Sequence, residues 1–207
     1  MSEPLIALFD TQARVRLLRM FVFNPSLEAG MQEVLRRAKL SQRAAKTELN
    51  ILERAGIIKK KFIIETNEAT GKRRKVLGFT LNRQLPIAAP LQTFLYETAP
   101  INAKTLQRHL QGVGKIQVLV AAGVFIREFE RRIDVLVATE KLHAHKVEIA
   151  IRNLEAELGV EIKYAAFSTE DLRYRIGMHD KLIRDVFDYP HDLVVDKVGI
   201  KDEVRRR

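Results

Sequence analysis

The sequence contains no cysteine, which excludes disulfide bonds, thiolate zinc sites and cysteine nucleophiles. This absence fits a reducing compartment, and we expect the protein to be cytoplasmic. Apolar runs are short, and the longest, such as residues 117–125, fall well below the roughly 18 to 20 residues that a membrane span needs. The first ten residues carry Glu3 and Asp10 and no basic segment ahead of an apolar core, so we expect no secretory signal.

The remaining composition, 46% hydrophobic and 30% charged residues, is that of an ordinary globular protein. A length of 207 residues favours two small domains, because domains commonly run to about 100 to 150 residues. Pro86 and Pro90 mark a break in the pattern. We therefore predict an α+β chain with one domain over residues 1–88 and a second over residues 89–207.

The net charge of +10 is distributed unevenly along the chain. Residues 1–90 hold 17 Lys and Arg against 8 Asp and Glu, whereas residues 91–207 hold 19 against 18. Positive charge confined to one segment is typical of a polyanion site, because each neutralised phosphate releases counterions. Neither terminus has a basic amphipathic helix, so nucleic acid is favoured over a membrane surface.

Three helices are expected at the N-terminal end, over residues 11–24, 26–40 and 41–56, from apolar residues at helical spacing. Ser41 is a good N-cap for the third helix, and Gly56 stands where a left-handed C-terminal cap would lie. The very short connection between the second and third helices forces a tight angle between them. This arrangement predicts a helix-turn-helix.

The third helix presents one polar face, whose side chains are of the types that read DNA bases and anchor phosphates. Its members are Gln42, Arg43, Lys46, Thr47 and Asn50. A merely solvated helix face would look similar, so the DNA-binding interpretation depends on the segment that comes after this helix.

Two strand-like runs, residues 61–66 and 76–81, flank the turn-rich segment 67–71 and predict a hairpin. Four adjacent cations come directly after that turn and are expected on an exposed loop: Lys72, Arg73, Arg74 and Lys75. Alone, such a run could be a localisation signal or a solvated surface. Beside the polar third helix, it favours a basic wing in contact with phosphates.

The run AKLSQRAAKTELNILERAGII, followed by the hairpin and GFTLN, resembles the winged helix-turn-helix of ArsR-like and MarR-like transcriptional regulators over about 80 residues. The resemblance implies that the polar face of the third helix enters the major groove and that residues 72–75 contact the flanking backbone or minor groove. ArsR-type metal sensors use cysteine or histidine clusters. This chain has no cysteine and no histidine before His109, so metal sensing by the first domain is not supported.

Strand and helix patterns alternate in the second half, which predicts an α/β or α+β domain. The expected strands cover residues 116–122, 133–138, 160–167 and 193–195, and the expected helices cover 91–96, 105–111, 140–158, 168–177 and 181–187, the last of these being the final helix.

This arrangement, with RIDVLVAT at its centre, resembles the small nucleotidyltransferase domain of the DNA polymerase beta superfamily. That family has a glycine-serine pair after its first strand and two aspartates, one residue apart, on its second strand, which hold two magnesium ions. Here the matching positions are Gly123-Val124 and Arg132-Ile133-Asp134, so the serine and the first aspartate are missing. One carboxylate cannot gather two divalent cations, and we expect no transferase activity, no cofactor and no metal.

Gly123 and Asp134 are accordingly interpreted as vestigial positions, and Asp134 could simply pair with Arg131 or Arg132. His143 and His145 are two apart on an expected helix and therefore face different directions, which makes them poor ligands for one metal.

The leading hypothesis is a sequence-specific double-stranded DNA-binding transcriptional regulator that acts as a homodimer. Its C-terminal domain would supply dimerisation, contact with a protein partner or sensing of a small ligand. Two alternatives remain: a nucleotidyltransferase acting on a protein or nucleotide, and an antitoxin-like protein-interaction module.

Overall fold

The computed structural model describes residues 4–66, 71, 73–128 and 131–205. These residues pack as two compact units: an N-terminal unit that runs to Ala99 and includes Glu155–Val160, and a C-terminal unit made of Pro100–Leu154 and the chain from Glu161 onward. Each unit combines helices with a small sheet, so the chain is of the mixed α+β class. Within the described ranges, no helix has both the length and the apolar character that crossing a membrane requires.

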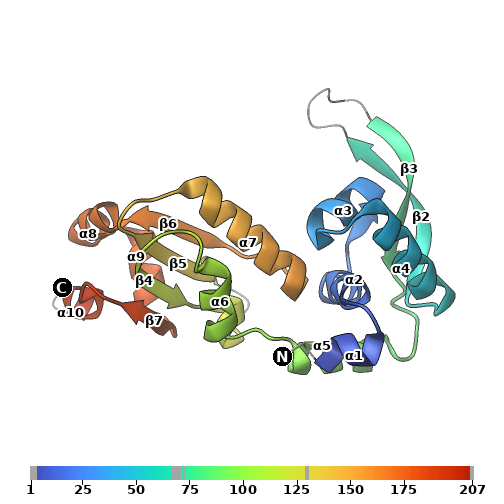
Figure 1. The fold of residues 1–207 in the computed structure, drawn as a ribbon, viewed down its shortest axis with the longest axis horizontal. Coiled ribbons are helices and arrows are strands. Elements are labelled where there is room, and N and C mark those ends of the chain that lie inside the picture. Colours follow the sequence, from blue (N-terminus) through green and yellow to red (C-terminus); the bar gives the residue numbers. More distant parts are fainter. Residues whose placement is uncertain (1–3, 67–70, 72, 129–130, 206–207) are drawn as a thin grey trace. The chain divides into compact units, whose positions relative to one another are not determined.

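The N-terminal unit consists of α1 (Pro4–Phe9), α2 (Gln12–Phe23), β1 (Glu28–Gly30), α3 (Met31–Ala38), α4 (Gln42–Arg54), β2 (Ile58–Thr66), β3 (Arg73–Leu81) and α5 (Ala88–Thr98) (Figure 1). The Thr11 side chain caps α2 by accepting a hydrogen bond from the backbone N–H of Arg14, at 3.0 Å. Ser41 caps α4 in the same way, by accepting from the N–H of Ala44 at 3.3 Å. These local capping signals set where both helices begin.

The end of α4 is a Schellman motif. Gly56 takes the left-handed conformation, with φ of 71°, and its N–H donates to the carbonyl of Glu53 at 2.9 Å. The N–H of Ile57 reaches back to the carbonyl of Leu52 at 3.0 Å. Glycine adopts positive φ without the steric cost that a Cβ brings, so the chain turns here directly from α4 into β2.

The N-terminal sheet has the strand order β1-β3-β2, with all neighbours antiparallel. The expected helix over residues 26–40 is wrong in its first part, because Glu28–Gly30 pairs with β3 as the short strand β1 and α3 begins only at Met31. The expected first strand of the hairpin is also too short, since β2 begins at Ile58. Both differences come from pairing with β3, which local periodicity does not reveal.

The core of the N-terminal unit lies around α2, whose Leu17, Leu18 and Phe21 are fully buried. Leu49 of α4 joins this cluster, as does Leu95 of α5. The inward residues of α4 therefore pack one side of that helix against α2, and the opposite side is exposed to solvent.

The C-terminal unit consists of α6 (Ala103–Leu110), β4 (Ile116–Ala121), the 3₁₀ helix η1 (Gly123–Ile126), β5 (Val135–Thr139), β6 (Tyr164–Ser168), α8 (Thr169–Gly177), α9 (Lys181–Phe187), β7 (Asp192–Asp196), α10 (Ile200–Arg205) and all but the last turn of α7 (Ala144–Leu158). Its sheet has the order β6-β5-β4-β7 (Figure 1). Strand β4 is antiparallel to β5 and β7, and β5 is parallel to β6.

Strands β4 and β5 are buried on both faces, as their continuous apolar runs predict. On one face, Val118, Val120 and Leu136 pack against residues of α8, α9 and α10. The largest differences from the elements expected from the sequence are three: α7 begins at Ala144 rather than near 140, β6 begins at Tyr164 rather than 160, and α10 comes after the helix that was expected to be the last.

Candidate functional site

The outward side of α4 carries all five residues that the sequence singles out, and each is exposed. We call this set the α4 face: Gln42, Arg43, Lys46, Thr47 and Asn50. At about 100° per residue they span roughly 140° of the helix circumference. The hydroxyl of Thr47 donates to the carbonyl of Arg43 at 3.1 Å, and its lone pairs remain available to accept.

Arg54 extends the α4 face and was not identified from the sequence. It lies four residues after Asn50, is exposed, and occupies the last turn of α4. The signal was present in the spacing, since Thr47, Asn50 and Arg54 recur at intervals of three and four. The exposed cations of this surface are therefore three: Arg43, Lys46 and Arg54.

A buried ion pair fixes the orientation of α4. Glu48 is only 5% exposed, and its carboxylate accepts from the hydroxyl of Thr11 and from Nε of Arg14, both at 2.8 Å. Thr11 and Arg14 stand at the start of α2, so these bonds join the first turn of α2 to the middle of α4. The charge-assisted contact is stronger than a neutral one and restricts rotation of the helix that bears the α4 face.

The connection between α3 and α4 is short, as expected, and consists of three residues, 39–41. Lys39 takes the left-handed conformation, with φ of 53°, which ends α3 abruptly. The guanidinium of Arg16 donates to the carbonyl of Ala38 at 3.2 Å and so satisfies one of the free carbonyls at that helix end. The tight turn positions α4 directly after α3.

The basic run of the hairpin lies partly in a strand rather than on a loop, because β3 begins at Arg73 and not near residue 76. Lys72 lies outside the described residues. Successive strand residues point to opposite faces, so Arg73 and Lys75 share one face of the hairpin and Arg74 lies on the other. All three are exposed, and the Arg74 guanidinium pairs with Glu65 at 3.0 Å.

The face that carries Arg73 and Lys75 also carries exposed apolar side chains. Phe62 and Ile64 of β2 are 64% and 70% exposed, and Leu77 of β3 pairs directly across from Phe62. The Lys75 ammonium lies 4.8 Å from the centre of the Phe62 ring, within the range of a cation–π contact. This apolar surface was not predicted from the sequence, because alternation along a strand does not show which face of a hairpin is left exposed.

In the C-terminal unit, the structure brings Gly123 and Asp134 together. Gly123 comes shortly after β4 with φ of 49°, and a Cβ added there would lie 1.8 Å from Oδ1 of Asp134. Both carboxylate oxygens of Asp134 accept backbone hydrogen bonds, from the N–H of Val124 at 3.0 Å and of Lys163 at 2.8 Å. The carboxylate therefore ties η1, the start of β5 and the segment before β6 to one another.

The expected ion pair of Asp134 with Arg131 or Arg132 is wrong, because Arg131 pairs with Glu128 and Arg132 pairs with Asp185. Burial raises the pKa of Asp134, while the two backbone N–H donors and the charge of Lys163 act in the opposite direction. Across the described ranges, no three His, Asp or Glu side chains gather closely enough to hold a metal ion.

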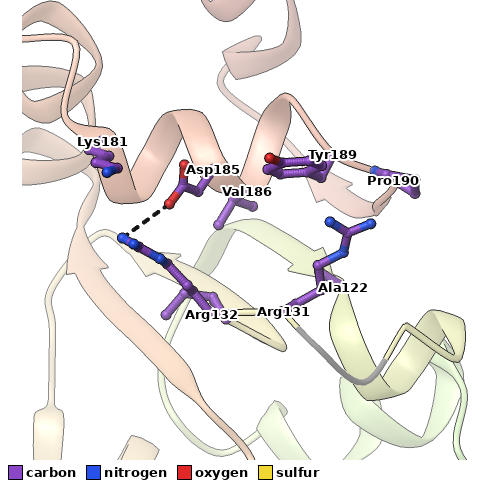
Figure 2. A pocket seen from close by; sticks show the side chains of 9 residues that line it. Ala122, Arg131, Arg132, Lys181, Asp185, Val186, Tyr189 and Pro190 are labelled. Carbon is purple, nitrogen blue, oxygen red and sulfur yellow. Dashed lines mark ion pairs between the residues drawn. The ribbon is translucent and has the colours of Figure 1, made fainter.

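A pocket of about 310 Å³ lies next to Gly123 and Asp134 (Figure 2). Its lining includes Ala122 and Ile133, the residues immediately before Gly123 and Asp134. Side chains from α9 and the segment after it form the other wall. The pocket therefore opens at the point where β4 ends and β5 begins.

Comparison of this chain with protein-family models, with curated proteins and with solved structures gave no significant match.

Proposed function

We propose that the N-terminal unit is a winged helix-turn-helix that binds double-stranded DNA sequence-specifically, and that the protein is a transcriptional regulator. The observation that carries this proposal is the α4 face: exposed residues that can read bases, on a helix locked by the Glu48 pair and entered by a three-residue turn. A helix with its side chains is about 10 to 12 Å wide, which fits the major groove of about 12 Å.

In this proposal Arg43 reads a guanine edge, Gln42 and Asn50 pair with adenine, and Lys46 and Thr47 contact phosphate. The hairpin is the wing, and its exposed cations lie along the flanking backbone or minor groove. The confinement of the excess positive charge to residues 1–90 supports the same assignment.

The C-terminal unit is proposed to be a degenerate nucleotidyltransferase-like domain without transferase activity, which serves dimerisation, partner contact or sensing. Support comes from the order of β4, Gly123, Asp134 and β5, and from the Arg132 that stands where the family has its first aspartate. A homodimer would present two α4 faces to two half-sites, which raises affinity by linking two weaker contacts.

The direct test begins with selection of bound sequences from a random duplex pool, followed by affinity measurements on the selected duplex. Replacing Arg43 and Lys46 by alanine is expected to weaken specific binding by about 10- to 100-fold, because the base contact of Arg43 contributes about 1 to 3 kcal/mol and a phosphate contact of Lys46 is lost as well. A matched control replaces Lys146 and Arg152, two exposed cations of α7, and is expected to bind normally.

The wing is tested by salt dependence. Replacing Arg73 and Lys75 by alanine is expected to lower the slope of log affinity against log salt by about 2, since each phosphate contact contributes about 0.9. Sequence preference should change little. Unaltered DNA binding in both the α4 and the wing variants would refute the proposal.

A nucleotidyltransferase is the second candidate, favoured by the close approach of Gly123 to Asp134 beside a pocket. Magnesium-dependent incorporation of labelled nucleotide that disappears in Asp134→Asn, with the fold retained by circular dichroism, would establish it.

A protein-interaction module is the third candidate, favoured by the exposed Phe62 and Ile64 of the hairpin. Binding of a protein partner that is insensitive to salt and not displaced by duplex DNA would distinguish it.

A further inference from the structure

The pocket of the C-terminal unit is lined by an excess of positive charge. Arg131 and Arg132 extend from the segment before β5, and Lys181 stands at the start of α9, whereas Asp185 is the one carboxylate among the described lining residues (Figure 2). The remaining lining residues are Ala122, Ile133, Val186, Tyr189 and Pro190. Residues 91–207 as a whole are nearly neutral in charge, so this concentration of cations is local.

The contacts within the pocket leave part of this charge uncompensated. Arg132 reaches across to Asp185, at 3.3 Å, which accounts for one cation and the one carboxylate (Figure 2). The Lys181 side chain is exposed, and no carboxylate among the described residues pairs with its ammonium. Arg131 pairs with Glu128 at 3.1 Å outside the lining, but its Nε is buried and has no hydrogen-bond partner in the described part of the chain.

The guanidinium of Arg131 is held in place by an aromatic ring. Its central carbon lies 4.4 Å from the centre of the Tyr189 ring, in cation–π geometry. The backbone carbonyl of Arg131 accepts from the ammonium of Lys163 at 3.0 Å, which fixes the segment that bears both arginines. A guanidinium positioned in this way loses little entropy when it binds an anion, because its fork is already oriented.

We propose that this pocket binds a small phosphorylated metabolite, without a metal ion, through a phosphate or pyrophosphate group held by Arg132 and Lys181 on the Asp185 side of the pocket, with Arg131 beneath Tyr189 on the other side adding to the positive potential (Figure 2). Arginine forks match the geometry of phosphate oxygens, and lysine supplies a further point charge. A pocket of about 310 Å³ is of the size that takes a phosphate with a small organic part. The concave site is too small for a duplex, so the occupant is a small molecule rather than a nucleic acid.

The geometry makes two opposite predictions. Arg132 exchanges its Asp185 partner for the phosphate, so Arg132→Ala together with Lys181→Ala should weaken binding at least about tenfold. Asp185 repels an incoming dianion and competes for Arg132, so Asp185→Asn should bind the same anion about fivefold more tightly. A purely structural ion pair between Arg132 and Asp185 would give no gain in the second variant.

The test is isothermal titration of the full chain with inorganic pyrophosphate, adenosine 5′-monophosphate and uncharged adenosine, at low ionic strength. We expect the two phosphorylated probes to bind and adenosine not to bind, with the Lys146→Ala and Arg152→Ala double variant as a control of equal charge change. Thermal unfolding of each variant checks that the fold is retained.

The absence of binding of either phosphorylated probe up to about millimolar concentration would overturn the proposal. Equal weakening in the control variant would also overturn it, because the attraction would then be a general effect of charge. A variant in which Arg43, Lys46, Arg73 and Lys75 are replaced by alanine lacks the proposed DNA contacts of the N-terminal unit. If a DNA duplex still displaces pyrophosphate from this variant, the pocket binds nucleic acid instead. DNA binding by the N-terminal unit is measured separately, so failure here leaves that proposal standing.

Discussion

The buried pair between Glu48 and Arg14 should be essential for the placement of α4. In Arg14→Ala, the Glu48 carboxylate keeps the hydroxyl of Thr11 but loses the one cation that pairs with it among the described residues, and it remains in a site where its side chain is 7% exposed. An uncompensated buried charge is costly because the protein interior replaces water poorly around it. The first turn of α2 and the middle of α4 should separate more easily as a result.

The magnitude depends on the burial of the two partners. Removing one member of a fully buried pair destabilises a protein by about 3 to 5 kcal/mol. The Arg14 side chain is 19% exposed, so solvent screens part of the interaction, and we expect about 2 to 3 kcal/mol. Arg36→Ala serves as the control, because its partner Glu33 keeps Arg37 and the Arg36 side chain is 56% exposed, so about 0 to 1 kcal/mol is expected.

The assay is amide hydrogen exchange of α2 and α4 peptides, read by mass spectrometry in the full chain. A loss of about 2 to 3 kcal/mol accelerates exchange by about 30- to 150-fold where opening limits it. Replacing both partners, in Arg14→Met with Glu48→Leu, should restore most of the protection, because no buried charge is left unpaired. The reasoning is refuted if Arg14→Ala exchanges no faster than the Arg36→Ala control, or if the double variant exchanges as fast as the single one.

Three further predictions concern stability. Gly123→Ala should destabilise the C-terminal unit by about 2 to 4 kcal/mol, because the φ of Gly123 is 49° and the new Cβ would clash with the hydrogen-bonded carboxylate of Asp134. Thermal unfolding measures this change, and a melting temperature equal to that of the wild type would contradict it. Hydrogen bonds from Arg36 lower the pKa of Glu33 from 4.5 to about 2, with burial opposing and Arg37 assisting. The ionised form therefore stabilises α3 above pH 4.5, and this stabilisation is lost as the pH falls towards 2. In urea unfolding, Glu33→Gln should lower the free energy of unfolding by about 1 kcal/mol at pH 7 and by almost nothing near pH 2. A difference between variant and wild type that does not change with pH would argue against this account. Burial tends to raise the pKa of Asp196, but four backbone N–H donors at the start of α10 lower it overall. Asp196→Ala should therefore lower the stability of α10 by about 1 to 2 kcal/mol, and Asp196→Asn should lower it clearly less, because asparagine keeps a side-chain oxygen. Amide hydrogen exchange of α10 measures both effects. Equal losses of protection in the two variants would show that the side-chain oxygen is not the cause.

Local patterns predicted the elements whose determinants lie close together in the chain. The start of α4 at its Ser41 cap, its end at Gly56 and the exposure of the α4 face all result from caps and helical spacing. Arg54 belongs to the same pattern and could have been included, because it continues the interval of three and four residues.

Strands and surfaces that depend on pairing with distant residues could not be predicted from local sequence patterns. Strand β1 is three residues long and exists because it pairs with β3, about fifty residues later in the chain. The same ladder places Arg73 and Lys75 on one face of the hairpin and Arg74 on the other, although the sequence shows them as one continuous basic run. The prolines at 86 and 90 predict a domain boundary near residue 88, whereas only the tertiary structure shows that Leu95 packs into the N-terminal core.

The sequence by itself determined that the chain has no cysteine chemistry, that its excess positive charge lies in residues 1–90, and that one helix there carries a polar face. Only the tertiary structure decided that both oxygens of Asp134 accept hydrogen bonds from backbone amides, and that Arg131, Arg132 and Lys181 line one pocket. The reason is the range of the interactions. Helix caps and periodicity act within a few residues, whereas a pocket forms only when packing closes segments about fifty residues apart against each other.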